Sequence, residues 1–118
     1  MKINYITLGT NHMKRATQFY DELLYGTPFQ KAYGEGPMTM WLGHGLMFAL
    51  AEPYDGQRAT VANGSMIGLQ LDHPSEVDRL HALALSLGGE DAGTPAVRDG
   101  HHSAYVRDLD GHKLCLFA

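Results

Sequence analysis

The chain has 118 residues, 44% of them hydrophobic and 19% charged, a composition typical of a globular protein that excludes a disordered or low-complexity chain. Nine Lys and Arg against thirteen Asp and Glu give a net charge of −4, and the basic residues are scattered, so we expect no nucleic-acid or membrane partner. The single cysteine, Cys115, excludes an internal disulfide, and no signal peptide or membrane-length apolar run is present. We therefore expect a cytoplasmic protein. Seven histidines raise the question of a metal site.

The first half of the chain predicts a strand, a helix and further strands. Ile6-Thr7-Leu8 begins the strand pattern, and Gly26 ends a run of apolar residues at helical spacing. That run consists of Ala16, Phe19, Tyr20, Leu23 and Leu24. Strand-type sequence with glycine turns follows and includes Gly45–Leu50, and residues 53–63 are rich in turn residues and predict a linker.

The second half repeats this order. Ile67-Gly68-Leu69 matches the first strand, Pro74 opens a helix, and Gly88-Gly89 ends it. The apolar stripe of this helix consists of Val77, Leu80, Ala84 and Leu87. Asp108-Leu109-Asp110-Gly111 predicts a hairpin turn before the last strand. We interpret the chain as one domain, residues 1–118, with βαβββ modules at about 1–52 and 64–118; the alternative is coincidental similarity between two unrelated halves.

Two segments carry a family resemblance: TLGTNHMKRATQFYDELL near the start and AYVRDLDGHKLCLF at the end. The second is similar to the signature F/Y-x-x-D-P-D-G-N-x-x-E-L, with Leu109 in place of proline and His112 in place of asparagine. The chain thus resembles the vicinal oxygen chelate superfamily, which includes glyoxalase I, bleomycin resistance proteins and extradiol dioxygenases. The resemblance implies an α+β fold in which tandem βαβββ modules form a U-shaped mixed sheet around a cavity, with the helices outside. It also implies a homodimer.

Strand alternation assigns each strand residue to one face of this sheet. We expect these apolar residues to pack under the helices: Ile6, Leu8, Met38, Met40, Phe48, Leu50, Ile67, Leu69, Ala104, Val106, Leu114 and Leu116. We expect the complementary set to face the cavity: Tyr5, Thr7, Thr39, Trp41, Met47, Ala49, Met66, Gly68, Gln70, Ser103, Tyr105, Arg107, Lys113 and Cys115.

The resemblance also implies where a metal ion would be held. Metal-using relatives take His, Gln or Glu ligands from the first and last strand of each module. The corresponding residues here are Tyr5, Ala49, Met66 and Cys115. Alanine cannot ligate, a thioether is a poor ligand for such ions, and one thiol does not make a site. We therefore expect no metal and no other cofactor; a divalent metal is the less favoured alternative.

The histidines do not replace these ligands. His101 shares strand parity with Ser103 and Tyr105 and can reach the cavity, whereas His102 points to the other face, so the pair cannot readily chelate one ion. The others are assigned elsewhere: His12 and His73 to capping at helix starts, His44 to an exposed turn, His81 to the wet flank of a helix, and His112 to the helix-facing side of the last strand.

Aromatic residues with a few polar tips are the usual lining of a small-molecule pocket. Tyr5, Trp41 and Tyr105 form such a wall, or they are plain core. Arg107 either supplies a polar tip beside Gln70 and Lys113 or pairs with Asp108 or Asp110 at the turn. Cys115 is either a nucleophile, if a base lowers its pKa, or a small apolar residue.

The sequence therefore predicts a glyoxalase- or bleomycin-resistance-like protein that binds a small molecule in the sheet cavity without the usual metal. The ligand-binding residues are expected to be Tyr5, Trp41, Met66, Gln70, His101, Tyr105, Arg107 and Cys115. The alternative is a metal-dependent enzyme of glyoxalase or dioxygenase type, in which the ion polarises the substrate and an unusual site draws on His101, Tyr5 or Cys115.

Overall fold

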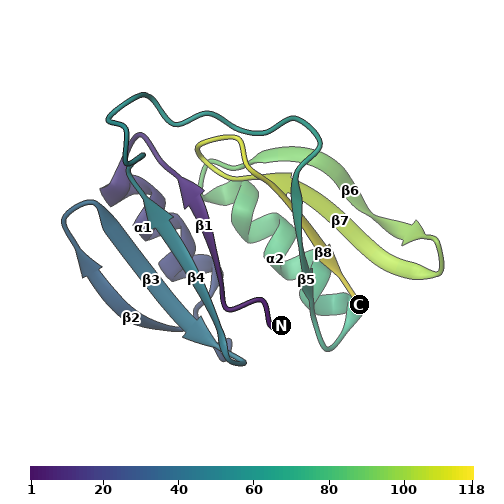
Figure 1. Ribbon diagram of the computed structural model, residues 1–118. Helices are drawn as coiled ribbons and strands as arrows, with labels where there is room; N and C mark the ends of the chain where they lie inside the picture. Colours follow the sequence, from purple (N-terminus) through teal and green to yellow (C-terminus); the bar gives the residue numbers. More distant parts are fainter. The chain divides into compact units, whose positions relative to one another are not determined.

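Each half of the chain folds as a strand, a helix and three further strands. The computed structural model describes residues 1–118 and consists of two units, Met1–Thr60 and Val61–Ala118. The first unit contains β1 (Tyr5–Gly9), α1 (Met13–Leu23), β2 (Gln30–Glu35), β3 (Met38–Gly43) and β4 (Leu46–Ala51). The second contains β5 (Met66–Gln70), α2 (Pro74–Ser86), β6 (Glu90–Arg98), β7 (His101–Arg107) and β8 (Lys113–Phe117) (Figure 1). The predicted α+β class and the tandem βαβββ order are confirmed.

Both units have the same mixed four-stranded sheet. The order is β1-β4-β3-β2 in the first unit and β5-β8-β7-β6 in the second. In each sheet the first strand of the unit runs parallel to the last, and the other pairs are antiparallel. The helix of each unit packs on one face of that unit's own sheet (Figure 1). The opposite face of each sheet is left without a helix from the same unit.

The core of the first unit lies between α1 and the strands β3 and β4. Ala16, Phe19, Tyr20 and Leu23 form the buried stripe of the helix, as the apolar spacing predicts. The Tyr20 ring lies 4.8 Å from the Phe48 ring and 6.0 Å from the Trp41 ring, between centroids. Gly26, with φ of 77°, adopts a left-handed conformation in the turn that follows α1.

Trp41 and Thr39 were expected on the face away from the helix, and this prediction is wrong. Trp41 is 2% exposed, and its indole Nε1–H donates to Oδ1 of Asp21 in α1 at 3.0 Å. Thr39 is also buried, and its hydroxyl lies 2.9 Å from the hydroxyl of Thr17 in α1. Because Trp41 is the cross-strand partner of Phe48, both residues lie on the helix-facing side.

The same register moves two methionines in the opposite direction. Met38 pairs with Ala51 and Met40 pairs with Ala49, so both methionines lie on the side away from α1 and not under the helix. The cause is the turn, in which only His44 and Gly45 separate the paired residues Gly43 and Leu46. A turn of two residues pairs odd-numbered with even-numbered positions, and the assignment from alternation placed equal parities on one face.

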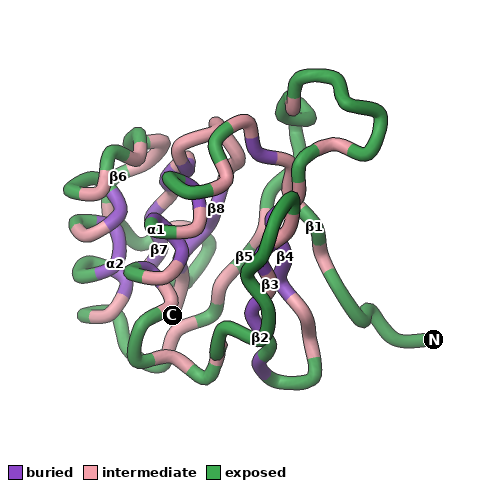
Figure 2. The backbone as a smooth tube through the Cα atoms, turned by 90° about the vertical axis from the view of Figure 1, so that its left-hand side faces the viewer, coloured by how far each residue is buried: buried purple, intermediate pink, exposed green.

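The core of the second unit follows the sequence prediction closely. Ala104, Val106, Leu114 and Leu116 are at most 1% exposed and lie on the α2 side of the sheet. Figure 2 shows the buried residues of this unit where α2, β7 and β8 pack together. His81, expected on the wet flank of the helix, is instead 5% exposed. Its Nε2 lies 3.0 Å from Oδ1 of Asp91 at the start of β6, so a buried polar group is satisfied.

The helix-to-strand connection of the second unit leaves no room for a side chain. A Cβ on Gly89 would lie 2.8 Å from the carbonyl oxygen of Ala84 and 2.9 Å from that of Arg107. Glycine is therefore required where the chain passes from α2 into β6. Neither α1 nor α2 is long and apolar enough to cross a lipid bilayer.

Candidate ligand-binding faces of the two sheets

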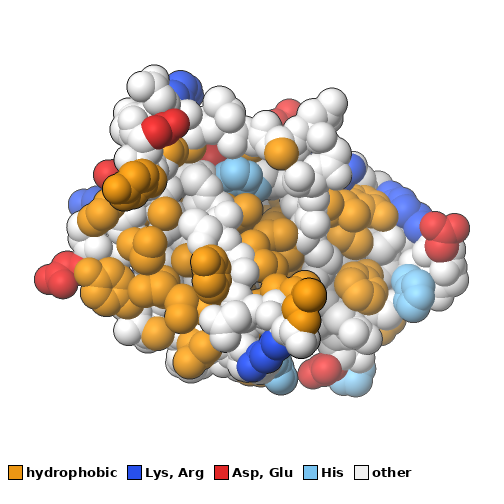
Figure 3. All heavy atoms as spheres, in the orientation of Figure 1, with side chains coloured by type: hydrophobic (Ala, Val, Ile, Leu, Met, Phe, Trp, Pro, Cys, Tyr) orange, Lys and Arg blue, Asp and Glu red, His pale blue; other side chains and the backbone are white.

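The face of the first sheet away from α1 is apolar across β1, β3 and β4, apart from Thr7. Its cross-strand rows include Tyr5 with Met47 and Leu42, and Thr7 with Ala49 and Met40. Tyr5 is 64% exposed and Leu42 is 48% exposed. Figure 3 shows hydrophobic side chains gathered over β2, β3 and β4 on this side of the molecule. This face offers apolar contact and little charge.

The corresponding face of the second sheet combines a small buried floor with aromatic rings. Cys115 and Ser103 are 8% and 3% exposed, and Cys115 pairs with Gly68 on one side and Tyr105 on the other. The Tyr105 ring lies across β6 at Gly93, because a Cβ there would be 2.7 Å from Tyr105 Cδ2. The absence of a side chain at Gly93 thus leaves the space that the ring occupies.

Three basic side chains lie near Tyr105: two of them beside its ring, and the third in the next cross-strand pair. The guanidinium carbon of Arg98 lies 5.3 Å from the Tyr105 ring centroid, and Lys113 Nζ lies 5.0 Å from it. Arg107 is the direct cross-strand partner of Lys113. None of the three forms an ion pair with a carboxylate of the protein. Such distances allow cation–π attraction, so the ring and the cations hold one another in place.

Of the eight residues predicted to bind a ligand, all but Trp41 lie on a face away from the helix of their own unit. On the second sheet these are Met66, Gln70, His101, Tyr105, Arg107 and Cys115. Tyr5 has the corresponding place on the first sheet. Trp41 belongs to the core under α1. That the other seven contact a ligand stays a prediction.

The structure adds two residues that the sequence reasoning missed. Phe117 lies beside the predicted residue His101, with 5.9 Å between ring centroids. Arg98 is held beside Tyr105 by hydrogen bonds to two backbone carbonyls, from Nη1 to that of Ser103 at 2.6 Å and from Nη2 to that of Thr94 at 2.7 Å. The alternation of β8 carries a signal for Phe117, two residues beyond Cys115. β6 pairs irregularly with β7, so alternation alone does not place Arg98.

Arg107 and Cys115 each had two readings. Arg107 Nη1 donates to the carbonyl of Gly111 at 2.9 Å, so the predicted alternative of an ion pair with Asp108 or Asp110 is wrong. The cross-strand neighbours of Cys115 are Gly68 and Tyr105, neither of which supplies an imidazole or a carboxylate. Its surroundings favour the small apolar residue over the activated nucleophile.

The residues at the family's metal positions do not fit a divalent ion. Tyr5 and Ala49 in the first unit and Met66 and Cys115 in the second supply a phenol, a methyl group, a thioether and one thiol. None of these is an imidazole, carboxylate or amide, the donors that such a site uses. No group of three or more His, Cys, Asp or Glu lies close enough elsewhere to hold an ion.

The histidines have other places. His44 is exposed in its turn, as expected. His12 and His73 stand at the N-caps of α1 and α2, but neither side chain makes the expected capping hydrogen bond. His102 Nε2 lies 2.7 Å from Oδ1 of Asp78 in α2. These contacts are those of surface and packing residues.

The carboxylate of Asp91 lies beside the buried His81, and the pKa of this carboxylate is clearly shifted. The backbone N–H of Gly93 donates to Asp91 Oδ1 at 3.0 Å, and His81 Nε2 lies at the same distance from this oxygen. The hydrogen bond from Gly93, followed by that from His81, lowers the pKa of Asp91 below its usual value. This contact links α2 to the strand that supports Tyr105.

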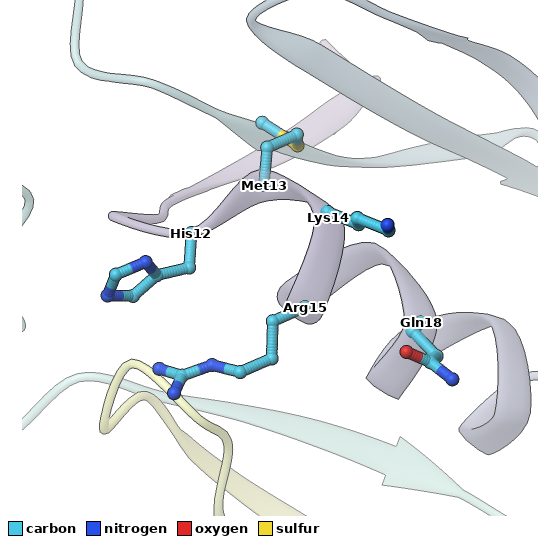
Figure 4. Close-up of a pocket in the computed structure, with 5 residues that line it drawn as sticks. All are labelled: His12, Met13, Lys14, Arg15 and Gln18. Atoms are coloured by element: carbon cyan, nitrogen blue, oxygen red, sulfur yellow. The ribbon is translucent and has the colours of Figure 1, made fainter.

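A hollow of about 390 Å³ lies outside both sheet faces, at the start of α1 (Figure 4). His12, Met13, Lys14, Arg15 and Gln18 line it, and all five come from one segment of the chain. None of these residues was predicted as a ligand contact. Met13 is tied to the core, because its sulfur accepts a hydrogen bond from Thr39 at 3.3 Å.

The fold defines the class of protein, and comparison with known proteins gives the family. A model of the Glyoxalase/Bleomycin resistance protein/Dioxygenase superfamily matches residues 2–116. The chain belongs to this superfamily, as the resemblance of its sequence implied. A search of curated proteins gave no match.

Solved structures agree with this assignment. A glyoxalase/bleomycin resistance protein from Albidiferax ferrireducens is 30% identical, with a TM-score of 0.89 over 97% of this chain and 95% of that chain. A glyoxalase-related enzyme from Fulvimarina pelagi is 18% identical, with a TM-score of 0.84 over 99% and 87% of the two chains. The fosfomycin resistance protein FosX from Mesorhizobium loti, also 18% identical, has a TM-score of 0.76 over 99% and 91%. The last two likenesses concern the fold alone.

Proposed function

We propose that the protein binds a small organic molecule on the sheet face of the second unit, without a metal ion at the family's metal positions. The observation that carries this proposal is the composition of that face. Tyr105 and Phe117 stand beside a floor of Cys115, Ser103 and Gly68, and the basic side chains of Arg107 and Lys113, which form no ion pair with a carboxylate, lie on the same face. A small apolar floor with aromatic sides and few polar groups is the usual composition of a small-molecule site.

The chemistry of the metal positions supports the second half of the proposal. With a methyl group and a thioether among the four side chains, a ligand would have to be held by the protein itself. Its orientation would come from Gln70, Arg107 and Lys113, and its apolar contact from the rings.

Amide NMR spectra of the full chain test the binding. A panel of small aromatic, aliphatic, anionic and cationic compounds should include members that shift amides of β7 and β8 saturably. Binding should persist in EDTA, and the protein after dialysis should hold well under one equivalent of Zn, Ni, Fe or Mn. No saturable shift on these strands with any compound would refute the binding. Retention of one equivalent of metal, or loss of binding in EDTA, would refute the metal-free site.

The proposal extends to the location, oligomeric state and partners of the protein. We propose a cytoplasmic homodimer without a nucleic-acid or membrane partner, on the basis of the single free cysteine, the net charge of −4 and the family resemblance. Sedimentation equilibrium at several concentrations tests the dimer, and a mass of one chain throughout the range would contradict it.

A further inference from the structure

Two cations stand directly opposite each other on the second sheet. Arg107 of β7 and Lys113 of β8 are cross-strand partners, and both side chains lie on the face away from α2. Like charges in this arrangement destabilise a sheet. Glu90 is the partner of Arg107 on its other side, but it forms no ion pair with either cation. No close ion pair with a carboxylate of the protein therefore offsets the repulsion between Arg107 and Lys113.

Lys113 is the least engaged of these groups. Its ammonium makes no hydrogen bond to the protein and leans toward the Tyr105 ring, with 5.0 Å between Nζ and the centroid. Arg98, in contrast, donates hydrogen bonds to two backbone carbonyls, and its guanidinium lies beside the Tyr105 ring. Arg107 donates one hydrogen bond to the Gly111 carbonyl, and its remaining N–H groups are available to a ligand. The free cationic donors of this face therefore belong to Lys113 and Arg107.

This concentration of positive charge is local. The chain carries a net charge of −4, yet two of its nine basic residues, Arg98 and Lys113, adjoin one tyrosine ring, and a third, Arg107, is the cross-strand partner of Lys113. Two of the other basic residues, Lys31 and Arg79, are paired with carboxylates. An anion placed between Lys113 and Arg107 would relieve their repulsion and form charge-assisted hydrogen bonds.

We propose that this face takes a planar organic carboxylate: Lys113 and Arg107 hold the carboxylate, and the Tyr105 ring contacts the flat body of the molecule. This inference rests on the proposed function and names the chemical class of its ligand. The two cations account for the charge. The Tyr105 ring, which lies against the backbone of Gly93, accounts for the planar part.

Titration with four probes, followed by amide NMR, tests the ligand class. The probes are 4-hydroxybenzoate, its neutral amide, benzamidine and inorganic phosphate. We expect 4-hydroxybenzoate to shift amides of residues 105–107 and 113–115 and to bind at least tenfold more tightly than the amide or benzamidine, because a charge-assisted hydrogen bond is worth about one such factor. Its affinity should fall as salt is added.

Substitution of the cation separates the site from general attraction. Lys113→Gln should weaken 4-hydroxybenzoate about tenfold and leave the fold intact, since it removes a like-charge contact. The matched control is Lys14→Gln in α1, which removes the same charge elsewhere and should leave the affinity unchanged. Equal effects of the two substitutions would overturn the proposal.

The remaining outcomes distinguish this inference from the proposed function. If the amide or benzamidine binds the same residues as tightly as the carboxylate, the ligand class is wrong while small-molecule binding stands. Phosphate binding as tight as that of 4-hydroxybenzoate would show that the site takes a bare anion and would overturn the role of Tyr105. If none of the probes shifts these amides, the carboxylate proposal fails, and the wider panel then decides whether the face binds any small molecule.

Discussion

Trp41 lies under α1 in the observed register, whereas simple alternation places it on the opposite face of the sheet. The substitution Trp41→Phe tests this placement. The substitution removes the hydrogen bond from the indole N–H to Asp21 and leaves a small gap under α1, where Trp41 is 2% exposed. We assign about 1.5 kcal/mol to a hydrogen bond to a charged acceptor and about 1 kcal/mol to the smaller ring. The lower end of the hydrogen-bond range applies, because the Asp21 side chain is 37% exposed and keeps Lys31 as a partner. We expect a loss of about 2–3 kcal/mol in the free energy of unfolding.

Urea unfolding followed by far-UV circular dichroism measures this loss, since the variant has no tryptophan left to report by fluorescence. Leu42→Ala is the matched control, because Leu42 follows Trp41 on β3, faces the other side and is 48% exposed. It should cost about 1 kcal/mol or less, well under the value for a buried leucine. A cost below about 0.5 kcal/mol for Trp41→Phe, or a larger cost for Leu42→Ala, would refute the placement of Trp41 in the core.

Three further predictions follow from the same contacts. The emission of Trp41 should be poorly quenched by acrylamide in the folded protein and strongly quenched in urea, because α1 covers the indole; equal quenching would contradict its burial. Gly93→Ala should destabilise the protein by about 1–3 kcal/mol, because the new Cβ would meet Tyr105 Cδ2 at 2.7 Å. The same change should cost less in a Tyr105→Leu background, and undiminished cost in urea unfolding would mean that the ring is not the obstacle. Since the pKa of Asp91 is lowered in the folded state, its ionised form adds stability above its usual pKa of about 3.9 and loses that contribution as the pH falls through the lower folded value. Asp91→Asn should therefore be less stable than the parent at neutral pH and approach it in acid, as measured by urea unfolding at a series of pH values; a gap that stays constant with pH would contradict the shift.

The helices and the repeat could be predicted because they depend on local patterns. Ala16, Phe19, Tyr20 and Leu23 recur at helical spacing, and all four are buried in α1. The repeat also predicted the order of strand, helix and three strands along each half. The spatial order of the strands within each sheet depends on longer-range pairing, and the sequence patterns did not predict it. The stripe of α2 was incomplete in one respect. His81 lies on its buried side because Asp91, from another strand, satisfies the ring, and no local pattern shows that partner.

The assignment of residues to sheet faces depended on turn length. In the second unit, Asp108–His112 separates the paired residues Arg107 and Lys113, so odd-numbered positions pair with odd-numbered ones and the predicted faces hold. In the first unit, His44 and Gly45 alone separate the paired residues, so the parity inverts. Both turn residues have positive φ, of 50° and 70°, as a tight two-residue hairpin requires. Gly45 indicated a turn in the sequence, but nothing in the sequence indicated that His44 also adopts a positive φ and that the turn is only two residues long.

The turn of the second unit has a further consequence for the proposed carboxylate site. Asp108 Oδ1 accepts hydrogen bonds from the backbone N–H groups of Asp110 and His112, at 3.0 and 2.9 Å, and Gly111 has a φ of 95°. These contacts fix the length of the turn and thereby place Arg107 opposite Lys113. A turn one residue shorter or longer would move one of the two cations to the face covered by α2, because successive strand residues point to opposite sides. The segment that resembles the family signature therefore also sets the position of the two charges, although Arg107 and Lys113 themselves occupy variable positions of that signature.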